Sequence, residues 1–257
     1  MYHQFKSYLN FLIRASNQHG VHSPFVYNLV TNCLYDKKQY PAYATLKEHR
    51  KKLFADTSTI SITDFGAGSR VFKSNKRPVN AIAKNAGISV KRQQLLFRLV
   101  TYFKPETILE LGTSLGMGTI AMALGAPLVT INTVEGCKTT SAIANTYFDD
   151  FGIKNVTIKT EPFETFFQQT ISEVFTFVYI DGNHSKEATL HNFSTLLKYA
   201  HNDSVFIFDD IYWSPEMTEA WQEIIAHPKV TVSIDTFQWG LVFFRKEQPK
   251  QHFSIRL

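Results

Sequence analysis

The sequence is poor in cysteine and in long apolar runs, and each shortage excludes a class of protein. Only two cysteines, Cys33 and Cys137, occur among 257 residues, and their spacing suits neither a disulfide framework nor a metal cluster. No apolar run approaches the roughly 20 residues that span a bilayer, and the N-terminus lacks the pattern of a signal peptide. We therefore expect a cytoplasmic protein in a reducing compartment, without a membrane partner.

Charge is also sparse, at 19% of residues with a formal net charge of +5. The lysines and arginines are scattered and form no long basic tract, so the composition permits nucleic acid binding without requiring it. With 44% hydrophobic residues, a chain of 257 residues can bury one substantial core. These values predict a globular domain with an appendage.

The most informative stretch covers residues 106–118 and reads ETILELGTSLGMG. It predicts a buried strand, a glycine-rich turn and a helix. Gly112 allows the chain to leave the strand tightly, and Gly116 and Gly118 allow a ligand to approach backbone N–H groups at the helix start. Glu135 ends a second apolar run, where a carboxylate can accept both hydroxyls of a ribose. Together these features predict a site for a nucleoside-type cofactor.

Two observations narrow the choice of cofactor. The dinucleotide fingerprint needs a second glycine where this chain has Ser114, because a pyrophosphate touches the backbone there, so the pattern argues against NAD and FAD. A second glycine cluster at residues 64–69 is followed up to residue 78 by basic and polar residues rather than by a helix. We interpret residues 64–78 as an ordered basic loop, whose cations are either simply solvated or receive an anionic group of a substrate.

The pattern Glu-x-Gly-Thr-x-x-Gly-x-Gly that begins at Glu110 resembles motif I of the class I S-adenosylmethionine-dependent methyltransferases. It is most similar to the branch that contains the catechol and caffeoyl-CoA O-methyltransferases. The resemblance covers roughly residues 89–245 and implies that S-adenosylmethionine is the cofactor. The cofactor-binding residues that it implies are Glu110, Gly112, Thr113, Ser114, Gly116, Gly118, Glu135, Glu161 and Asp181.

Strands that alternate with helices from residue 89 onward predict an α/β fold with a parallel sheet. Gln238-Trp239-Gly240, between two β-prone runs, predicts a closing antiparallel hairpin. The resemblance implies a doubly wound, mostly parallel, seven-stranded sheet. Residues 1–88 are expected to form an N-terminal helical cap and the basic loop, and residues 89–257 the methyltransferase domain.

Acidic residues follow two further predicted strands, where ligands of such sheets bind. Asp181 and His184 follow one strand, and Asp209 and Asp210 follow the next. The resemblance implies that Asp181, Asp209 and Asp210 bind a divalent cation, usually Mg²⁺, although Asp210 stands where the family has asparagine. His184 stands where the family has a lysine base, and an imidazole can take a proton near neutral pH. Without an ion, the carboxylates would cap turns or bind backbone amides.

The resemblance implies an enzyme that methylates a hydroxyl group of a small-molecule acceptor, and it suggests a homodimer. Asp181 and His184 are the predicted catalytic residues. Two alternatives stay open: a methyltransferase that acts on RNA or protein, and a cofactor-binding module without catalysis. The acceptor itself cannot be read from the sequence, because its specificity resides in the N-terminal cap and in loops.

Overall fold

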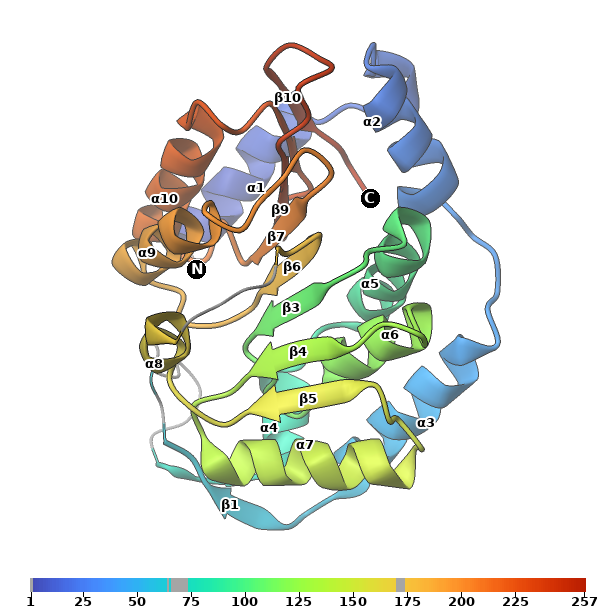
Figure 1. Cartoon of the computed structure of the whole chain (residues 1–257), viewed down its shortest axis with the longest axis vertical. Helices are drawn as coiled ribbons and strands as arrows, with labels where there is room; N and C mark the ends of the chain where they lie inside the picture. The colour runs from blue at the N-terminus through green and yellow to red at the C-terminus, as the bar shows by residue number, and fades with distance from the viewer. Residues whose placement is uncertain (1, 64, 66–73, 170–173) are drawn as a thin grey trace. The chain divides into compact units, whose positions relative to one another are not determined.

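Figure 1 shows the computed structural model of the chain, in which two compact units can be distinguished. The structure describes residues 2–63, 65, 74–169 and 174–257. Residues 37–171 form what we call the continuous unit, and residues 1–36 together with 172–257 form the discontinuous unit. Apart from Phe65, the glycine cluster at residues 64–69 that we predicted to be part of a loop lies outside the described residues. The boundary at residue 88 between the expected N-terminal cap and the expected methyltransferase domain stays a prediction.

The continuous unit is built on three parallel strands in the order β3-β4-β5, with a helix after each of β3 and β4. Its elements are α3 (Ala42–Ala55), β1 (Thr59–Ser61), β2 (Lys76–Pro78), α4 (Val79–Asn85), α5 (Val90–Phe103), β3 (Ile108–Leu111), α6 (Met117–Gly125), β4 (Ile131–Val134), α7 (Lys138–Asp150), β5 (Val156–Lys159) and α8 (Phe163–Gln168). Every residue of β3 is buried, as expected for a strand covered on both faces.

Helix α5 shows how the sequence sets these boundaries. The Ser89 hydroxyl accepts a hydrogen bond from the backbone N–H of Arg92 and caps the helix start. Leu96, Leu99 and Val100 are fully buried along one face of α5. The helix ends at Lys104, whose φ of 48° lies in the left-handed region. The alternation of helices and strands expected from residue 89 onward therefore begins with this helix.

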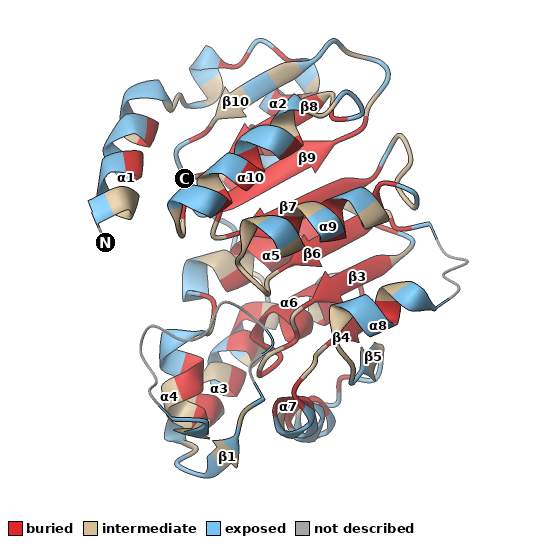
Figure 2. Cartoon of the chain, turned by 90° about the vertical axis from the view of Figure 1, so that its left-hand side faces the viewer, coloured by how far each residue is buried: buried red, intermediate tan, exposed pale blue. Residues whose placement is uncertain are grey.

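The discontinuous unit contains five strands in the order β10-β8-β9-β7-β6. Its elements are α1 (Tyr2–Arg14), a 3₁₀ turn (Gln18–Gly20), α2 (Pro24–Leu29) with a π-helical extension (Val30–Leu34), β6 (Phe177–Ile180), α9 (Lys186–Leu196), β7 (Val205–Asp209), α10 (Pro215–Ala226), β8 (Val232–Asp235), β9 (Trp239–Phe243) and β10 (Gln251–Ser254). Strand β7 is buried throughout and pairs in parallel with β6 and antiparallel with β9. Figure 2 shows α9 and α10 lying over one face of these buried strands.

The predicted α/β architecture is confirmed: four of the six described strand pairings in the β3–β10 set are parallel, and β8 and β9 form the expected antiparallel hairpin. Strand β10 adds a further parallel partner to β8 that the sequence did not indicate. The short antiparallel pair of β1 and β2 and helix α4 were also not expected. The expected N-terminal helices are confirmed, and the hydroxyl of Ser23 caps the start of α2.

The predicted hairpin turn is wrong by two residues. Trp239 and Gly240 belong to strand β9, and the positive φ of 72° falls on Phe237 instead. Gly240 is required for packing, because a Cβ at this position would lie 2.5 Å from the ring of Trp221 on α10. Across the described part of the chain, no helix is long and apolar enough to cross a membrane.

Candidate functional site

The glycine-rich turn of the continuous unit follows β3 and carries three positive φ angles. Gly112 has a φ of 105°, Ser114 of 48° and Gly116 of 76°. Ser114 therefore adopts a left-handed conformation that usually favours glycine. Gly116 is the N-cap of α6, and a Cβ there would lie 2.5 Å from the ring of Phe148 on α7. This glycine is thus required by its own φ and by packing, in addition to any role toward a ligand.

The carboxylate of Glu135, at the end of β4, holds this turn in place. Its Oε2 accepts a hydrogen bond of 2.8 Å from the backbone N–H of Ser114. Its Oε1 accepts one of 2.9 Å from the backbone N–H of Cys137, at the start of α7. Glu135 is only partly buried. A carboxylate oxygen has two acceptor positions, so the side chain can hold the turn and still accept ligand hydroxyls.

Beneath the turn lies a buried chain of hydrogen bonds that ends on Glu110. The hydroxyls of Thr119 and Thr133 donate to Oε2 of Glu110 over 2.5 Å and 2.6 Å, and the hydroxyls of Thr113 and Thr133 are 2.6 Å apart. Burial raises the pKa of Glu110 to about 7. Glu110 and Thr113, both predicted to contact the cofactor, therefore join β3, β4, α6 and the turn from within. A direct contact with the cofactor stays a prediction.

The two other predicted cofactor residues of this unit, Gly118 and Glu161, differ in their surroundings. Gly118 is buried in the first turn of α6. Glu161 follows β5, and both of its carboxylate oxygens accept from the side-chain amide of Gln169, over 2.7 Å and 2.8 Å. Each of these oxygens can accept a second hydrogen bond, so Glu161 remains available to a hydrogen-bond donor of a ligand.

The discontinuous unit brings together the predicted catalytic residues. Asp181 follows β6, and its Oδ2 accepts a hydrogen bond of 3.0 Å from the hydroxyl of Tyr179. The Nε2 of His184 lies 3.7 Å from Oδ1 of Asp181, and the two side chains are 25% and 21% exposed. The ring of His184 lies 6.2 Å from that of Trp213. An imidazole next to a carboxylate, with both groups open to solvent, can exchange a proton with a bound ligand.

Asp209 is the last residue of β7, and Asp210 follows it directly. Asp209 is buried, and its Oδ1 accepts a hydrogen bond of 2.9 Å from the backbone N–H of Asp210. Asp210 has a φ of 53° and lies at the point where the chain leaves the strand. Carboxylates are the ligands that hard cations prefer. However, the described His, Cys, Asp and Glu side chains form no group of three or more that could hold a metal ion.

Sequence reasoning missed a buried pair next to this turn. The hydroxyl of Tyr212 donates a hydrogen bond of 2.5 Å to Oδ2 of Asp235, at the end of β8. Burial and this carboxylate raise the pKa of Tyr212, and burial raises that of Asp235. Tyr212 stacks on Phe237, which also contacts Tyr8 of α1. The acid that ends the apolar run of β8 was the signal that could have revealed this pair.

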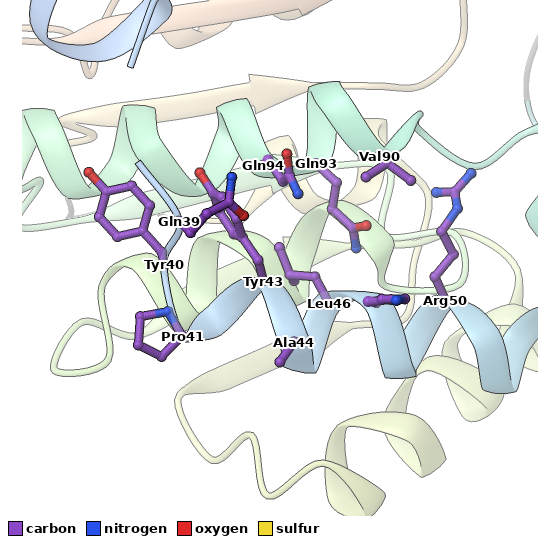
Figure 3. Close-up of a pocket in the computed structure, with 11 residues that line it drawn as sticks. Gln39, Tyr40, Pro41, Tyr43, Ala44, Leu46, Arg50, Val90, Gln93 and Gln94 are labelled. Carbon is purple, nitrogen blue, oxygen red and sulfur yellow. The ribbon is translucent and has the colours of Figure 1, made fainter. Parts of the chain in front are cut away.

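A separate cavity of about 380 Å³ lies in the continuous unit between α3 and α5 (Figure 3). Tyr43 and Leu46 of α3 and Gln93 of α5 line it. The side-chain amide of Gln93 donates to the backbone carbonyl of Met117, the first residue of α6. None of the residues predicted for cofactor or catalysis lines this cavity, which therefore does not represent the predicted site.

Comparisons with known proteins agree with the fold. Residues 109–211 match the family model of a methyltransferase domain, and this stretch contains the glycine-rich turn, Glu135, Asp181 and His184. No curated protein sequence matches the chain. The predicted resemblance to class I methyltransferases is confirmed by the family match and by the shared fold described next.

Several solved structures have the same fold at low sequence identity. The SAH-bound methyltransferase PaMTH1 of Podospora anserina is 14% identical with a TM-score of 0.62, over 88% of this chain and 97% of that one. The O-methyltransferase TomG of Streptomyces achromogenes, solved with SAM, is 15% identical with a TM-score of 0.58, over 86% and 95%. An O-methyltransferase of Bacillus cereus in complex with SAH is 18% identical with a TM-score of 0.56, over 81% and 93%.

Proposed function

We propose that this protein transfers the methyl group of S-adenosylmethionine to a hydroxyl group of a small molecule. The observation that carries the proposal is the bond between Glu135 and the N–H of Ser114, which joins an acid at the end of β4 to the glycine-rich turn after β3. This arrangement places one carboxylate beside the glycine-rich turn, at the ends of two adjacent parallel strands. The related folds solved with SAM or SAH support the choice of cofactor.

In this proposal, the continuous unit binds the cofactor. Glu135 accepts the ribose hydroxyls, and the turn around Gly112 receives the amino-acid part of the cofactor against its backbone. Glu161 accepts a hydrogen bond from the adenine amine. The bound sulfonium supplies an activated methyl group, so the protein mainly has to position the acceptor and the donor.

The discontinuous unit removes the proton from the acceptor. His184 accepts it at a ring nitrogen, and the carboxylate of Asp181 stabilises the resulting imidazolium. Tyr179, which donates to the other oxygen of Asp181, keeps that carboxylate oriented. The acceptor oxygen then forms its bond to the methyl carbon as the carbon–sulfur bond breaks, and the sulfur retains the electron pair.

Each of these steps uses only side chains of this protein. Asp181, Asp209 and Asp210 have suitable oxygen ligands, but the described acids do not gather into a group of three. We therefore assign no step to a metal, and the predicted Mg²⁺ site stays a prediction. Dialysis against EDTA, followed by turnover assays with and without added Mg²⁺, tests this site. The cation is supported if dialysis abolishes turnover, if Mg²⁺ restores turnover in the wild type, and if Mg²⁺ does not restore it in Asp209→Asn.

Calorimetric titration tests the cofactor. We expect S-adenosylmethionine and its demethylated product to bind and NAD not to bind. Glu135→Gln, which removes a charged acceptor, is expected to weaken S-adenosylmethionine binding at least roughly tenfold. Glu164→Gln, an exposed acid on α8, is the matched control and is expected to leave the affinity unchanged. Binding of NAD instead, or an unchanged affinity in Glu135→Gln, would contradict the proposal.

Methyl transfer itself is tested with a labelled donor and a mixture of phenols, alcohols, RNA and denatured protein. Label on a small molecule is the expected outcome. Label on RNA or protein would favour a macromolecular acceptor, for which the net charge of +5 is the supporting observation. Binding of the cofactor without transfer to any class would indicate a module that has lost catalysis.

A further inference from the structure

The cavity between α3 and α5 has a positively charged lining. Two cations of α3, Lys47 and Arg50, line it, and the described residues around it include no aspartate or glutamate. The two helices have the same bias: α3 contains four lysines and arginines and one acid, and α5 contains three and no acid. The potential at the cavity is therefore positive, which favours an anionic occupant.

Arg50 is held in a fixed position beside this cavity. Its Nη1 donates a hydrogen bond of 2.6 Å to the backbone carbonyl of Ile88, and its guanidinium lies 4.7 Å from the centre of the Phe54 ring. A guanidinium has five N–H donors, and the bond to Ile88 uses one of them. Two further N–H groups can bind a carboxylate in the planar, paired geometry that guanidinium groups favour. Lys47, which is exposed three residues earlier on the same helix, adds a second positive charge.

The rest of the cavity suits an aromatic ring. Its large apolar lining side chains are Tyr40, Tyr43, Leu46 and Val90. The rings of Tyr40 and Tyr43 lie edge-on at 5.4 Å, and each also contacts the buried ring of Phe97, at 5.2 Å and 5.6 Å. The two tyrosines are thereby fixed against the core of the continuous unit. A rigid aromatic wall favours a planar, apolar occupant, because ring packing adds to the free energy of burial.

The size of the cavity limits the occupant to a small molecule. A volume of about 380 Å³ lies at the lower end of the range for ligand sites, which suits a molecule with one ring. A nucleic acid strand, which the basic helices would also attract, needs a groove that follows several phosphates. The amides of Gln39 and Gln94 also line the cavity and can bind a polar substituent on the ring.

We propose that this cavity is a second small-molecule site, separate from the cofactor site, which binds an aromatic carboxylate with one ring. The carboxylate pairs with Arg50 and Lys47, and the ring packs against Tyr40 and Leu46. None of the residues assigned to the cofactor or the acceptor lines the cavity, so binding at this site does not depend on the proposed methyl transfer.

Gln93 connects this site to the glycine-rich turn. It is 1% exposed, and its side-chain amide donates a hydrogen bond of 2.9 Å to the backbone carbonyl of Met117, which follows the N-cap Gly116 of α6. Figure 3 shows Gln93 extending from α5 toward α3. An occupant that packs against Gln93 restrains this amide and the start of α6. We therefore expect the demethylated product of S-adenosylmethionine to bind roughly threefold more tightly when the site is occupied. This coupling, unlike binding itself, rests on the proposed function.

Calorimetric titration of the full chain with sodium benzoate tests the site. Benzoate has a ring and a carboxylate but no hydroxyl that can accept a methyl group, so it probes the cavity and not the acceptor site. We expect a dissociation constant of about 1 mM or lower. Methyl benzoate, which lacks the charge, and inorganic phosphate, which lacks the ring, are expected to bind at least roughly tenfold more weakly.

Two substitutions locate the bound benzoate. Lys47→Gln and Arg50→Gln each remove one of the cations and are expected to weaken benzoate binding at least roughly fivefold. Lys51→Gln is the matched control: it makes the same change of charge on an exposed lysine of α3 that does not line the cavity, and it should leave the affinity unchanged. Lys47 is exposed, so Lys47→Gln keeps the test valid even if Arg50→Gln, which loses the bond to Ile88, does not fold.

The site is overturned if benzoate does not bind at about 10 mM, if phosphate binds as well as benzoate, or if Lys47→Gln binds benzoate as the wild type does. The coupling is overturned if saturating benzoate leaves the affinity for the demethylated product unchanged or weakens it. A failure of S-adenosylmethionine and its product to bind would count against the proposed function alone, because the benzoate titration is carried out without them.

Discussion

The acids at the ends of β3 and β4 have different surroundings from Asp181, the acid that follows β6. In the continuous unit, Glu110 is 1% exposed and binds threonine hydroxyls, and Glu135 binds backbone N–H groups of the glycine-rich turn. In the discontinuous unit, Asp181 is 21% exposed and lies beside the equally accessible ring of His184. Glu110 holds the two threonines and Glu135 holds the glycine-rich turn before any ligand arrives, whereas Asp181 and His184 remain accessible to a ligand.

Replacing Asp181 by asparagine gives the largest expected effect and tests this difference directly. We expect turnover to fall roughly 100- to 1,000-fold, because an amide does not stabilise the imidazolium of His184. The affinity for S-adenosylmethionine is expected to change less than about threefold. Single-turnover rates and calorimetric titration measure the two quantities. Asp149→Asn, an exposed acid on α7, is the control. A variant that lost affinity but kept its rate would assign Asp181 to cofactor binding instead.

Gly116→Ala gives the largest expected loss of stability. Its φ of 76° strains any side chain, and the new Cβ would lie 2.5 Å from the ring of Phe148. We expect the free energy of unfolding to fall by about 3–4 kcal/mol. Gly152 has a similar φ of 65° but no atom within 4 Å of the new Cβ, so Gly152→Ala should lose only about 1 kcal/mol. Urea unfolding measures both values, and equal losses would show that φ strain alone explains Gly116.

The sequence predicted the strands and helices from residue 89 onward because their apolar periodicity is strong and their caps are recognisable. Ser89 before α5, Ser185 before α9 and Ser214 before α10 each accept a backbone N–H of the first turn. The short strands β1, β2 and β10 escaped detection because each contains at most one hydrophobic residue and therefore shows no apolar run or alternation. Such strands are defined by their pairing partners, which a single sequence does not reveal.

The sequence predicted which residues lie at the strand ends, but not the contacts that these residues make. Glycine was interpreted as a turn or ligand-contact residue, yet Gly116 and Gly240 are also dictated by rings that lie far away in the sequence, Phe148 and Trp221. Glu110 was predicted to face a cofactor, and the structure binds it to Thr119 and Thr133. Nothing in the local pattern identifies these two threonines as partners, because they come from a helix and from a neighbouring strand.

Glu110→Gln tests whether ionisation of the buried Glu110 lowers the stability of the fold at high pH. The folded pKa of about 7 lies above the ordinary value of 4.5, so the folded chain keeps a proton that the unfolded chain releases. Stability therefore falls as the pH rises from about 4.5 to about 7. The glutamine keeps an acceptor for both threonines without titrating, so at pH 8 we expect the variant to be more stable by up to about 3 kcal/mol. Urea unfolding at pH 5 and pH 8 provides the comparison, and parallel pH profiles would contradict it.

His49→Leu tests a buried titratable group that, unlike Glu110, lacks hydrogen bonds. The ring nitrogens of His49 have no hydrogen-bond partner among the described residues. The ring lies between Tyr147 and Phe151 of the α7 region, and burial, together with the charge of Lys52, lowers its pKa to about 4. The unfolded chain binds a proton near the ordinary value of 6.5, so wild-type stability falls as the pH drops from about 6.5 to about 4.

At pH 7 the two effects of this substitution nearly cancel, which makes it the smallest of these changes. Leucine removes buried nitrogens without partners, which stabilises the fold, and loses ring contacts, which destabilises it, so we expect a net change within about 1 kcal/mol. At pH 5 the wild type should have lost about 2 kcal/mol that the variant keeps. His49→Gln is the control, since it retains polar atoms but does not titrate. If wild type and both variants lose stability equally between pH 7 and pH 5, His49 is not the group responsible, and its burial without partners has no effect on acid stability.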